Sequence, residues 1–377
     1  PLVHVYTDAT ITGTAGYIGN FETRIESERG GTEIKHGATV IAVGADAYEP
    51  AEYLYGQDER VVTHLELEEL IHQQRGNAIN ATSLVMIQCV GCRNEDRQYC
   101  SRVCCTESVK NALALKEINP EIDIYILYRD MRTYGFSEDY YREAANRDVR
   151  FIRYEPGDEP EVEAGESEDG RPVLKVTVPD YILGVKLEID ADIVALAAAV
   201  VPPAASQEIS RTFKVPLGPD GFFQEAHVKL RPVDFAAEGI FLCGTAHYPK
   251  HIPEAIAQAY GAAGRVLTLL SHDIVTVSGS VCEVDERKCI SCGACITACA
   301  YDAIEFRETP QGKKAAVNPV LCKGDGLCNA KCPTGAILLR HFTDRELLSQ
   351  IDAVIPEKEI VRQIDAAAVY ALSLIHI

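Results

Sequence analysis

Short strand-like and helix-like runs, separated by polar turns, follow one another along the chain. Near the N-terminus, residues 3–6, 16–26 and 38–45 predict strands. The third run is apolar almost throughout and reaches Gly44 near its end. An uninterrupted apolar run of this kind is typical of a buried parallel strand, and the glycine lets its backbone pass close to a ligand. We therefore expect a strand here that belongs to a ligand-binding sheet.

Strands and helices alternate in the next part of the chain. After a polar segment at residues 77–82, which predicts a linker, they are expected in turn at residues 84–87, 108–118, 122–128, 138–146 and 149–154. This alternation predicts a βαβαβ unit with a parallel sheet. The acidic segment 158–169 predicts a solvated loop. Two runs after it predict a small antiparallel excursion, at residues 173–178 and 185–189.

A second strand-to-helix unit precedes a cysteine-rich segment. Residues 192–201 and 239–245 predict buried strands, and residues 253–271 predict a helix rich in alanine. The cysteine-rich module spans residues 281–339, and an amphipathic helical tail follows from residue 344. The last residues, 371–377, follow no helix or turn pattern, so the end of the tail is not interpreted.

The composition is that of an ordinary globular protein with an acidic surface. The 377 residues carry a formal net charge of −20, and 47% are hydrophobic, so two or three domains are expected. An acidic surface repels phosphate backbones, which argues against nucleic acid as a partner. The longest apolar run, residues 193–205, contains two prolines and is shorter than the about 20 residues that span a membrane. The chain starts with neither Met nor a leader, so we expect a cytoplasmic protein and a sequence that begins inside a larger one.

The fourteen cysteines are concentrated in two groups. Five lie within residues 89–105, eight within residues 282–332, and Cys243 stands alone. Disulfide scaffolds spread their cysteines over small secreted domains. Two dense groups in a large chain predict metal sites instead.

The C-terminal group has the spacing of a bacterial ferredoxin. Its first half reads C-x2-C-x2-C-x3-C, in which three thiolates bind one iron–sulfur cube and the fourth binds the neighbouring cube. A second half repeats these offsets with Asp325 in place of one cysteine. The ligands predicted for the first cluster are Cys289, Cys292, Cys295 and Cys332. The ligands predicted for the second are Cys299, Cys322 and Cys328, with Asp325 as the candidate fourth.

The altered ligand leaves the type of the second cluster open. A carboxylate is harder than a thiolate, so the iron beside Asp325 is expected to be labile or shifted in potential, and a 3Fe–4S cluster is an alternative. Structural zinc is the other alternative, although zinc sites favour C-x2-C pairs around a longer spacer. Cys282 lies outside the pattern and is expected to be a small buried residue.

The N-terminal cysteines lie where a Rossmann domain carries its phosphate-binding loop, between the first strand and the first helix of the βαβαβ unit. Only Gly91 is present there, so the G-x-G-x-x-G loop is missing. This predicts a nicotinamide-binding fold converted to hold a cluster. The predicted ligands are Cys89, Cys100, Cys104 and Cys105.

Five thiols are one too many for one cube, so Cys92 is interpreted as a substitute or bystander. The basic residues Arg93 and Arg102, together with the helix N-terminus, would stabilise an anionic cluster. Two alternatives stay open: zinc, or a redox-active pair formed by Cys89 and Cys92.

A candidate flavin site follows the 239–245 strand. Gly244 and Thr245 come directly after apolar residues, and Lys250 precedes the alanine-rich helix. Backbone amides and a helix N-terminus favour an anionic cofactor, and a lysine there could interact with a flavin ring. Strand–glycine–helix connections occur in any α/β domain, so a purely structural role is the alternative.

Several of these motifs together resemble one family. They are QCVG at residues 88–91, YCSRVCC at 99–105, RDMRTYG at 129–135, GT at 244–245 and PKHIPE at 249–254. In this order, and followed by the ferredoxin-type tail, they resemble the A subunit of heterodisulfide reductase over nearly the whole chain. The resemblance implies an α/β fold. Its parts would be an incomplete thioredoxin-reductase-like FAD domain, an inserted Rossmann-like βαβ domain and a C-terminal α+β two-cluster ferredoxin domain.

The resemblance also implies a function. The chain would be an oxidoreductase subunit of methanogenesis that uses FAD and 4Fe–4S clusters. It would split an electron pair between ferredoxin and a disulfide-reducing partner. Implied partners are other heterodisulfide-reductase-type subunits, a hydrogenase or dehydrogenase donor, and ferredoxin, with homo-oligomers inside a larger complex. Related proteins are quinone-interacting oxidoreductase subunits. The implied flavin contacts are Gly44, Gly244, Thr245, Lys250 and Ile252.

The chain departs from the family pattern in places. The N-terminal pyrophosphate loop for FAD is missing, which suits an N-terminally truncated sequence. A ferredoxin insert is also missing, because only residues 27–38 connect the strands there. The expected domains are residues 1–76 (end of the FAD-binding segment), 77–170 (Rossmann-like, with the cluster loop), 171–279 (rest of the reductase body), 280–340 (ferredoxin-type) and 341–377 (helical tail).

Two other functions compete with this one. A pyridine-nucleotide disulfide oxidoreductase would use Cys89 and Cys92 as its dithiol, but it needs a nicotinamide loop that the sequence lacks. A ferredoxin-type scaffold that only bridges partner proteins would keep its clusters and bind no flavin.

Overall fold

The computed structural model describes residues 2–28, 30–73, 80–274, 276 and 278–354. The chain divides into two compact units, Pro1–Ser271 and His272–Ile377. Most of the predicted linker at 77–82, and the predicted end of the tail, lie outside the described residues. None of the described helices is long and apolar enough to cross a membrane.

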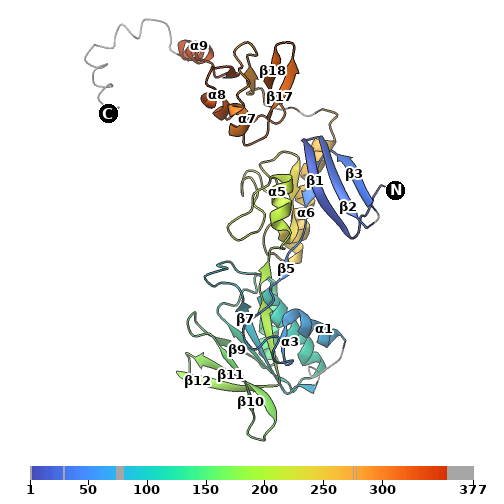
Figure 1. The fold of residues 1–377 in the computed structure, drawn as a ribbon. Coiled ribbons are helices and arrows are strands. Elements are labelled where there is room, and N and C mark those ends of the chain that lie inside the picture. The colour runs from blue at the N-terminus through green and yellow to red at the C-terminus, as the bar shows by residue number, and fades with distance from the viewer. Residues whose placement is uncertain (1, 29, 74–79, 275, 277, 355–377) are drawn as a thin grey trace, which may run out of the picture. The chain divides into compact units, whose positions relative to one another are not determined.

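The first unit contains a five-stranded parallel sheet (Figure 1). Its strand order is β6-β13-β7-β8-β9, and every neighbouring pair is parallel. The strands are β6 (Val61–Thr63), β7 (Ser83–Val90), β8 (Asp123–Tyr128), β9 (Val149–Arg153) and β13 (Ile193–Ala198). The predicted βαβαβ unit is thereby confirmed, and β6 and β13 extend its sheet on one side.

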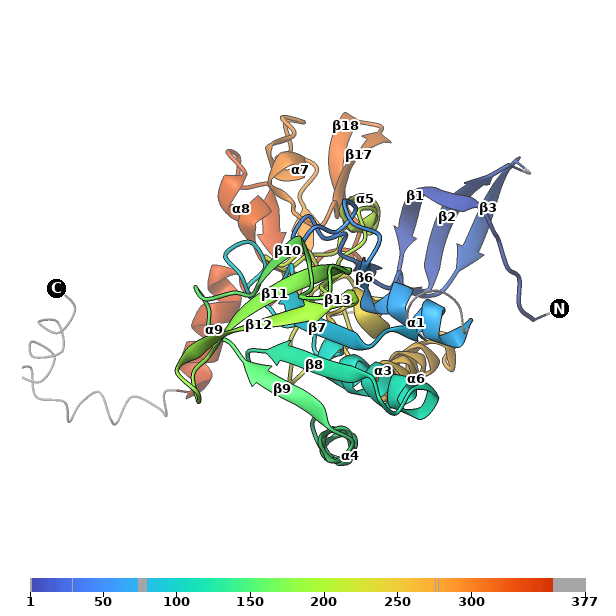
Figure 2. The same ribbon diagram turned by 90° about the horizontal axis from the view of Figure 1, so that it is seen from below.

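The two faces of this sheet are covered by different layers (Figure 2). On one face, Leu84 and Met86 pack among helix residues such as Val109 and Leu115. The helices nearby are α1 (His64–His72), α3 (Cys104–Ile118) and α4 (Ser137–Asn146). On the other face lies a three-stranded antiparallel sheet, formed by β10 (Glu161–Glu166), β11 (Pro172–Asp180) and β12 (Val185–Ala191). Because both faces are covered, most residues of the central strands are apolar.

Two of these elements differ from the sequence prediction. The prediction of a loop over 158–169 was wrong, because its central residues form β10 and pair with β11. Alternate residues of β11, such as Leu174 and Val176, are fully buried. β11 therefore offers a fixed edge with which the otherwise acidic β10 pairs. Helix α1 was not predicted, although Thr63 and Glu66 form a capping box at its start. That pattern is a helix N-terminus signal in the sequence.

His64 in the first turn of α1 predicts an acid sensitivity. Burial, and then the charge of Lys110, lower the pKa of His64 from 6.5 to about 3. Below pH 6.5 the unfolded chain therefore takes up a proton that the folded chain does not, and stability falls as the pH falls. At about 1.36 kcal/mol per pH unit, the loss between pH 6.5 and 5 is about 2 kcal/mol. Urea unfolding at both pH values measures this loss of stability, which should be smaller in His64→Gln than in wild type. An equal loss in the two proteins would show that His64 is not its source.

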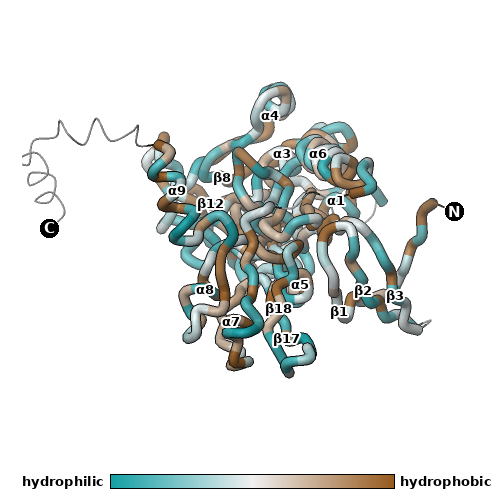
Figure 3. Tube along the Cα trace, turned by 90° about the horizontal axis from the view of Figure 1, so that it is seen from above, coloured by the Kyte–Doolittle hydropathy of each residue, from teal (hydrophilic) through white to brown (hydrophobic). Residues whose placement is uncertain are grey.

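The N-terminal residues form a separate antiparallel meander of β1 (Ala9–Tyr17), β2 (Asn20–Ser27) and β3 (Gly30–His36). The prediction of a single strand over 16–26 was wrong, since the chain reverses between Tyr17 and Asn20. Residues 3–6 are not a strand, and Val3 and Val5 are exposed, so no apolar surface holds them. Much of β2 and β3 is hydrophilic, as expected for strands with an exposed face (Figure 3).

Shorter elements complete the first unit. β4 (Thr39–Ile41) pairs in parallel with β15 (Ile240–Leu242), and β5 (Asp46–Ala47) pairs with β14 (Val200–Val201). The predicted 38–45 strand is thus parallel, as expected, but covers only three residues. Two helices, α5 (Ser206–Phe213) and α6 (Ile252–Leu270), follow β14 and β15 along the chain.

The second unit is a small α+β module built from two similar halves. β16 (Cys282–Val284) pairs with β19 (Ile337–Leu339), and β17 (Ile304–Thr309) pairs with β18 (Gly312–Val317). Each half carries a short helix, α7 (Ala294–Ala298) or α8 (Leu327–Lys331), that begins after a glycine with positive φ. The helix α9 (Asp344–Val354) follows, as the amphipathic pattern of the tail predicts.

Candidate iron–sulfur and flavin sites

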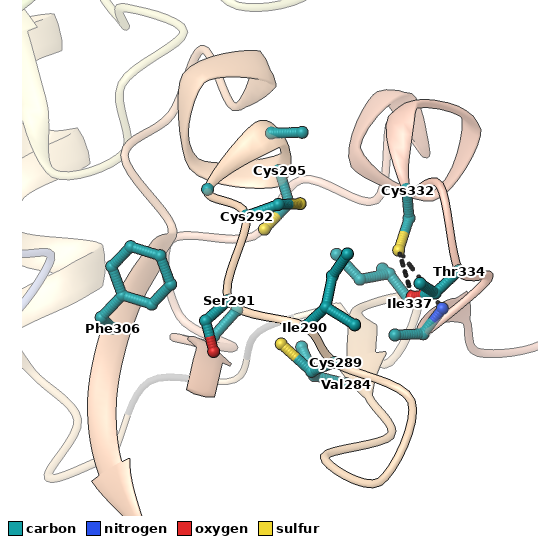
Figure 4. A pocket seen from close by; sticks show the side chains of 14 residues that line it. Val284, Cys289, Ile290, Ser291, Cys292, Cys295, Phe306, Cys332, Thr334 and Ile337 are labelled. Carbon is teal, nitrogen blue, oxygen red and sulfur yellow. Dashed lines mark hydrogen bonds between the residues drawn. The ribbon is translucent and has the colours of Figure 1, made fainter. Parts of the chain in front are cut away.

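The four cysteines predicted for the first ferredoxin-type cluster line one pocket (Figure 4). Their sulfur-bearing side chains come from three places, the loop before α7, α7 itself and the end of α8. Apolar residues, among them Val284, Phe306 and Ile337, form the rest of the lining. The ligands that share this pocket are Cys289, Cys292, Cys295 and Cys332.

Hydrogen-bond donors lie around the sulfur of Cys332. The Ala336 amide donates to Cys332 Sγ over 3.2 Å. Burial opposes ionisation of Cys332, but hydrogen bonds from Thr334 and Ala336 outweigh it and lower its pKa. Hydrogen bonds to sulfur stabilise negative charge on a cluster and adjust its potential. The pocket therefore suits an anionic cluster bound by four thiolates.

The second predicted set is distributed differently. Cys322 and Cys328 approach each other around Cys282, which contacts both: its amide donates to Cys322 Sγ over 3.4 Å, and Cys328 Sγ lies 3.4 Å from Cys282 Sγ. Cys299 Sγ accepts from the Ala303 amide over 3.4 Å. Asp325 is exposed and accepts from the Leu327 amide over 3.2 Å.

The donor sets of the module fit iron–sulfur clusters. Thiolates are soft ligands, and all the module's cysteines are free of disulfides. Within the residues described, no three His, Cys, Asp or Glu side chains are arranged around a single metal ion. A cube spreads its thiolates over four irons, so the arrangement it requires is wider than that of one ion.

The N-terminal cysteine loop connects β7 to α3 and is bent sharply. Cys89, Arg93 and Arg102 have positive φ although they are not glycines, and Gly91 has a φ of 76°. A Cβ on Gly91 would overlap the ring of Tyr48. Non-glycine residues held in this region store strain, which is common at functional sites. The folded conformation of the loop therefore has a raised conformational energy.

All five cysteines of this loop lie near one another. Burial, followed by the charges of Cys92, Cys105 and Cys100, raises the pKa of Cys104. Cys92 shares a hydrogen bond with Cys89, which raises the pKa of Cys89 and lowers that of Cys92. The structure therefore brings Cys92 into the same group as the predicted ligands. Metal binding would displace the protons that these buried thiols otherwise keep.

Arginines surround the loop on several sides. Arg93 reaches Cys89 Sγ over 3.8 Å and Asp130 over 2.6 Å. Burial by itself would raise the pKa of Asp130, but the interactions with Arg93 and Arg132 outweigh burial and lower this pKa. Arg129 donates to the Arg93 carbonyl over 2.7 Å. This basic shell would offset the negative charge of a thiolate-bound cluster, as the sequence predicted for Arg93.

The residues implied as flavin contacts form a second group in the same unit. Gly44 and Gly244 both have positive φ, and a Cβ on Gly44 would meet Thr245 Oγ1 at 4.0 Å. Lys250 donates to the carbonyls of Gly244 and Tyr248, each over 2.7 Å. Four of the five implied residues therefore gather around these two glycines.

The fifth, Ile252, is 77% exposed at the start of α6. One backbone amide at the N-terminus of α6 is already hydrogen-bonded within the chain: the His251 amide donates to Glu254 over 2.9 Å. The residues present suit the ring end of a flavin, where glycines leave room and a lysine supplies a cation. They include no loop for its pyrophosphate.

Arg102 connects the cysteine loop to this flavin-site candidate. Its guanidinium donates to the Pro249 carbonyl over 3.3 Å and to Glu254 over 2.7 Å. One residue of the cluster loop therefore touches the segment that leads into α6. Although Arg102 was chosen from the sequence for its charge, this contact across the chain was not predicted.

Comparisons with known proteins found a matching family model, similar sequences and solved structures. Residues 288–336 match the family model of a 4Fe-4S dicluster domain. The chain is 37% identical over 342 residues to the iron-sulfur A subunit of CoB--CoM heterodisulfide reductase from Methanocaldococcus jannaschii, covering 86% of this chain and 51% of that protein. It is 38% identical over 344 residues to the A subunit of H(2):CoB-CoM heterodisulfide,ferredoxin reductase from Methanothermobacter thermautotrophicus, covering 86% and 50%. Among solved structures, thioredoxin reductase of T. acidophilum matches with a TM-score of 0.44 and 12% identity, covering 70% of this chain and 74% of that one.

The chain is therefore an α/β protein with a C-terminal ferredoxin-type iron–sulfur domain, and that part of the predicted fold is confirmed. Over 86% of its length the chain is similar to the A subunits of heterodisulfide reductases. The chain spans about half the length of the relatives just described.

Proposed function

We propose that this chain is part of an electron-transfer subunit of a heterodisulfide-reductase-like complex, working with FAD and three iron–sulfur clusters. Its partners would be other subunits of that complex, a hydrogenase or dehydrogenase donor, and ferredoxin. Iron–sulfur thiolates need a reducing compartment, so the proposal includes a cytoplasmic location. It also includes self-association within the complex.

The observation that carries the proposal is the contact between the cysteine loop and the flavin-site candidate. Arg102 belongs to the loop and hydrogen-bonds to Pro249 and Glu254, on either side of Lys250 and Ile252. A flavin, when bound, exchanges electron pairs with one partner and single electrons with another. The cysteine loop would hold its cluster beside that group, and the ferredoxin-type module would carry single electrons to or from a partner.

The role proposed for the N-terminal site is electron transfer without acid–base chemistry. Arg93 and Arg132, which pair with Asp130, would offset the charge of the cluster, and the buried thiols would exclude water from it. Splitting of an electron pair between ferredoxin and a disulfide-reducing partner is the further part of the proposal. It is supported by a relative that is named as a reductase of both heterodisulfide and ferredoxin.

The test uses the whole chain, reconstituted anaerobically with iron, sulfide and FAD. Reduced low-potential ferredoxin should bleach both flavin and cluster absorbance, and NADPH should bleach neither. If NADPH binds tightly and reduces the flavin, the proposal is wrong and a pyridine-nucleotide disulfide oxidoreductase replaces it. The hydrogen-bonded pair Cys89 and Cys92 is the observation that favours this second candidate. Clusters without any bound flavin would instead favour a bridging scaffold.

Lys250 provides a separate test of the flavin site. Burial, and then the charge of Arg102, lower the pKa of Lys250 to about 8. Its ammonium is therefore present at pH 7 and is lost above pH 8, where FAD binding should weaken. A charge-assisted hydrogen bond contributes about 1.5 kcal/mol, so Lys250→Met should raise the Kd for FAD about tenfold at pH 7. Fluorescence titration measures this, with the exposed Lys110→Met as the matched control, and equal Kd values in the two variants would contradict the site.

A further inference from the structure

The two halves of the C-terminal module are related by a constant offset in sequence. Cys289 and Cys295 in the first half correspond to Cys322 and Cys328 in the second. The hydrogen bonds repeat with the same offset. The Cys289 amide donates to the Asp285 carbonyl as the Cys322 amide donates to the Asn318 carbonyl, each over 3.1 Å. An observation on one half therefore identifies the equivalent position in the other.

Ala315 and Cys282 are such a pair, each placed seven residues before the first cysteine of its half. Their strand partners also correspond, since Ala315 pairs with Phe306 and Cys282 pairs with Leu339. Ala315 and Phe306 both line the pocket of the first cluster. The position equivalent to Ala315 should line the pocket of the second cluster, and Cys282 occupies it.

The contacts of Cys282 agree with this placement independently. Its side chain is 3% exposed, and its sulfur lies 3.4 Å from the sulfur of Cys328. Its amide donates to the sulfur of Cys322 over 3.4 Å. Cys282 thus contacts two of the three cysteines predicted for the second cluster. A buried thiol in this place can bind iron without a change in the fold.

Asp325 is the weaker candidate for the fourth ligand. It is exposed, and its carboxylate accepts from the Leu327 amide over 3.2 Å at the start of α8. That is the role of a residue that caps a helix or turn. A carboxylate is also a harder ligand for iron than a thiolate. The second half thus has an aspartate at 325 where the repeated spacing calls for a cysteine, while Cys282 lies against Cys322 and Cys328.

We propose that Cys282 is the fourth thiolate of the second cluster, together with Cys299, Cys322 and Cys328, and that Asp325 is not a ligand. Cys282 lies outside residues 288–336, which the dicluster family model matches. The second site would then hold a 4Fe–4S cluster bound by four thiolates, one of them from β16. The inference rests on the proposed two-cluster content of the module.

The test compares Cys282→Ala with Asp325→Asn in the full chain after anaerobic reconstitution. An oxidised 3Fe–4S cluster has an EPR signal, whereas an oxidised 4Fe–4S cluster has none. We expect Cys282→Ala to lose about one iron per chain and to show this signal, because one corner of the cube lacks its thiolate. Wild type and Asp325→Asn should keep their iron and stay silent. The control is Cys243→Ala, which removes a buried cysteine of the other unit.

A rescue variant separates ligation from a role in folding. Cys282→Ala combined with Asp325→Cys restores the regular ferredoxin spacing, so it should regain the lost iron and lose the signal. The assignment is overturned if Asp325→Asn shows the 3Fe–4S signal and Cys282→Ala does not, or if the double variant stays deficient. If wild type holds zinc or no cluster, the proposed function itself fails. If wild type holds both clusters and Cys282→Ala is indistinguishable from it, only this inference fails.

Discussion

Replacing Cys104 by serine is expected to remove one whole cluster, about four irons of roughly twelve per chain, from the anaerobically reconstituted protein. Cys104 is 7% exposed at the first position of α3, and it lies close enough to Cys92, Cys100 and Cys105 for their charges to raise its pKa. Serine has nearly the same volume but is a poor ligand for iron. The loss should therefore come from ligation and should leave the packing of α3 intact.

Iron and sulfide analysis on matched variants measures this loss. Cys243→Ser is the control, because Cys243 is also buried in the first unit and lies outside both cysteine groups. It should keep all its iron. Cys92→Ser separates the two interpretations of the fifth thiol, since a bystander can be replaced without loss. Full iron content in the double variant Cys92→Ser/Cys104→Ser, which leaves no spare thiol, would contradict a cluster in this loop.

Replacing Gly91 by alanine is expected to destabilise the first unit by roughly 2–6 kcal/mol. The residue has a φ of 76°, and a Cβ there would overlap the Tyr48 ring. Left-handed strain costs about 1–3 kcal/mol, and overpacking costs about as much again. Because Gly91 lies within the cysteine loop, the same substitution should also lower the iron content. Chemical unfolding of wild type and variant measures the difference.

Gly157→Ala is the matched control for this substitution. Gly157 has a φ of 94°, but a Cβ there would meet nothing within 4 Å, so only the strain remains. Its cost should be about 1 to 3 kcal/mol. The combination of Gly91→Ala with Tyr48→Ala should recover part of the lost stability. Equal destabilisation by the two glycine substitutions would show that the Tyr48 contact does not shape the loop.

The sequence was most informative where spacing alone determines the chemistry. The intervals between Cys289, Cys292 and Cys295 allow one loop to present three thiolates, and the structure places all three in one pocket with Cys332. The alternation of apolar strands and helices in residues 84–154 predicted the parallel sheet. Both patterns are local, so neither requires knowledge of tertiary contacts.

Contacts between segments that are far apart in the chain could not be predicted from the sequence. Cys282 lies outside the ferredoxin spacing, and only the pairing of β16 with β19 and the approach of α8 bring it to Cys322 and Cys328. Arg102 and Glu254 are likewise far apart in the chain. One signal was available, since Cys282 and Ala315 occupy equivalent positions in the internal duplication. It becomes informative only after Ala315 is known to line a pocket.

Short or exposed strands were the other failure. β6 and β4 have three residues each, too few for a periodic pattern, and β10 is acidic because most of its side chains are exposed. Their strand structure depends on the partner strands β13, β15 and β11, which supply hydrogen bonds. Tertiary pairing of this kind overrides local preference.

The most direct test is a count of iron, sulfide and zinc together with the Mössbauer spectrum of the whole chain after anaerobic reconstitution. The account predicts three 4Fe–4S clusters, roughly twelve irons and as many sulfides per chain, and no zinc. Removal of the five cysteines at 89–105 should lower the count to roughly eight. Bound zinc without iron, or a count near eight in the intact chain that those substitutions leave unchanged, would contradict it.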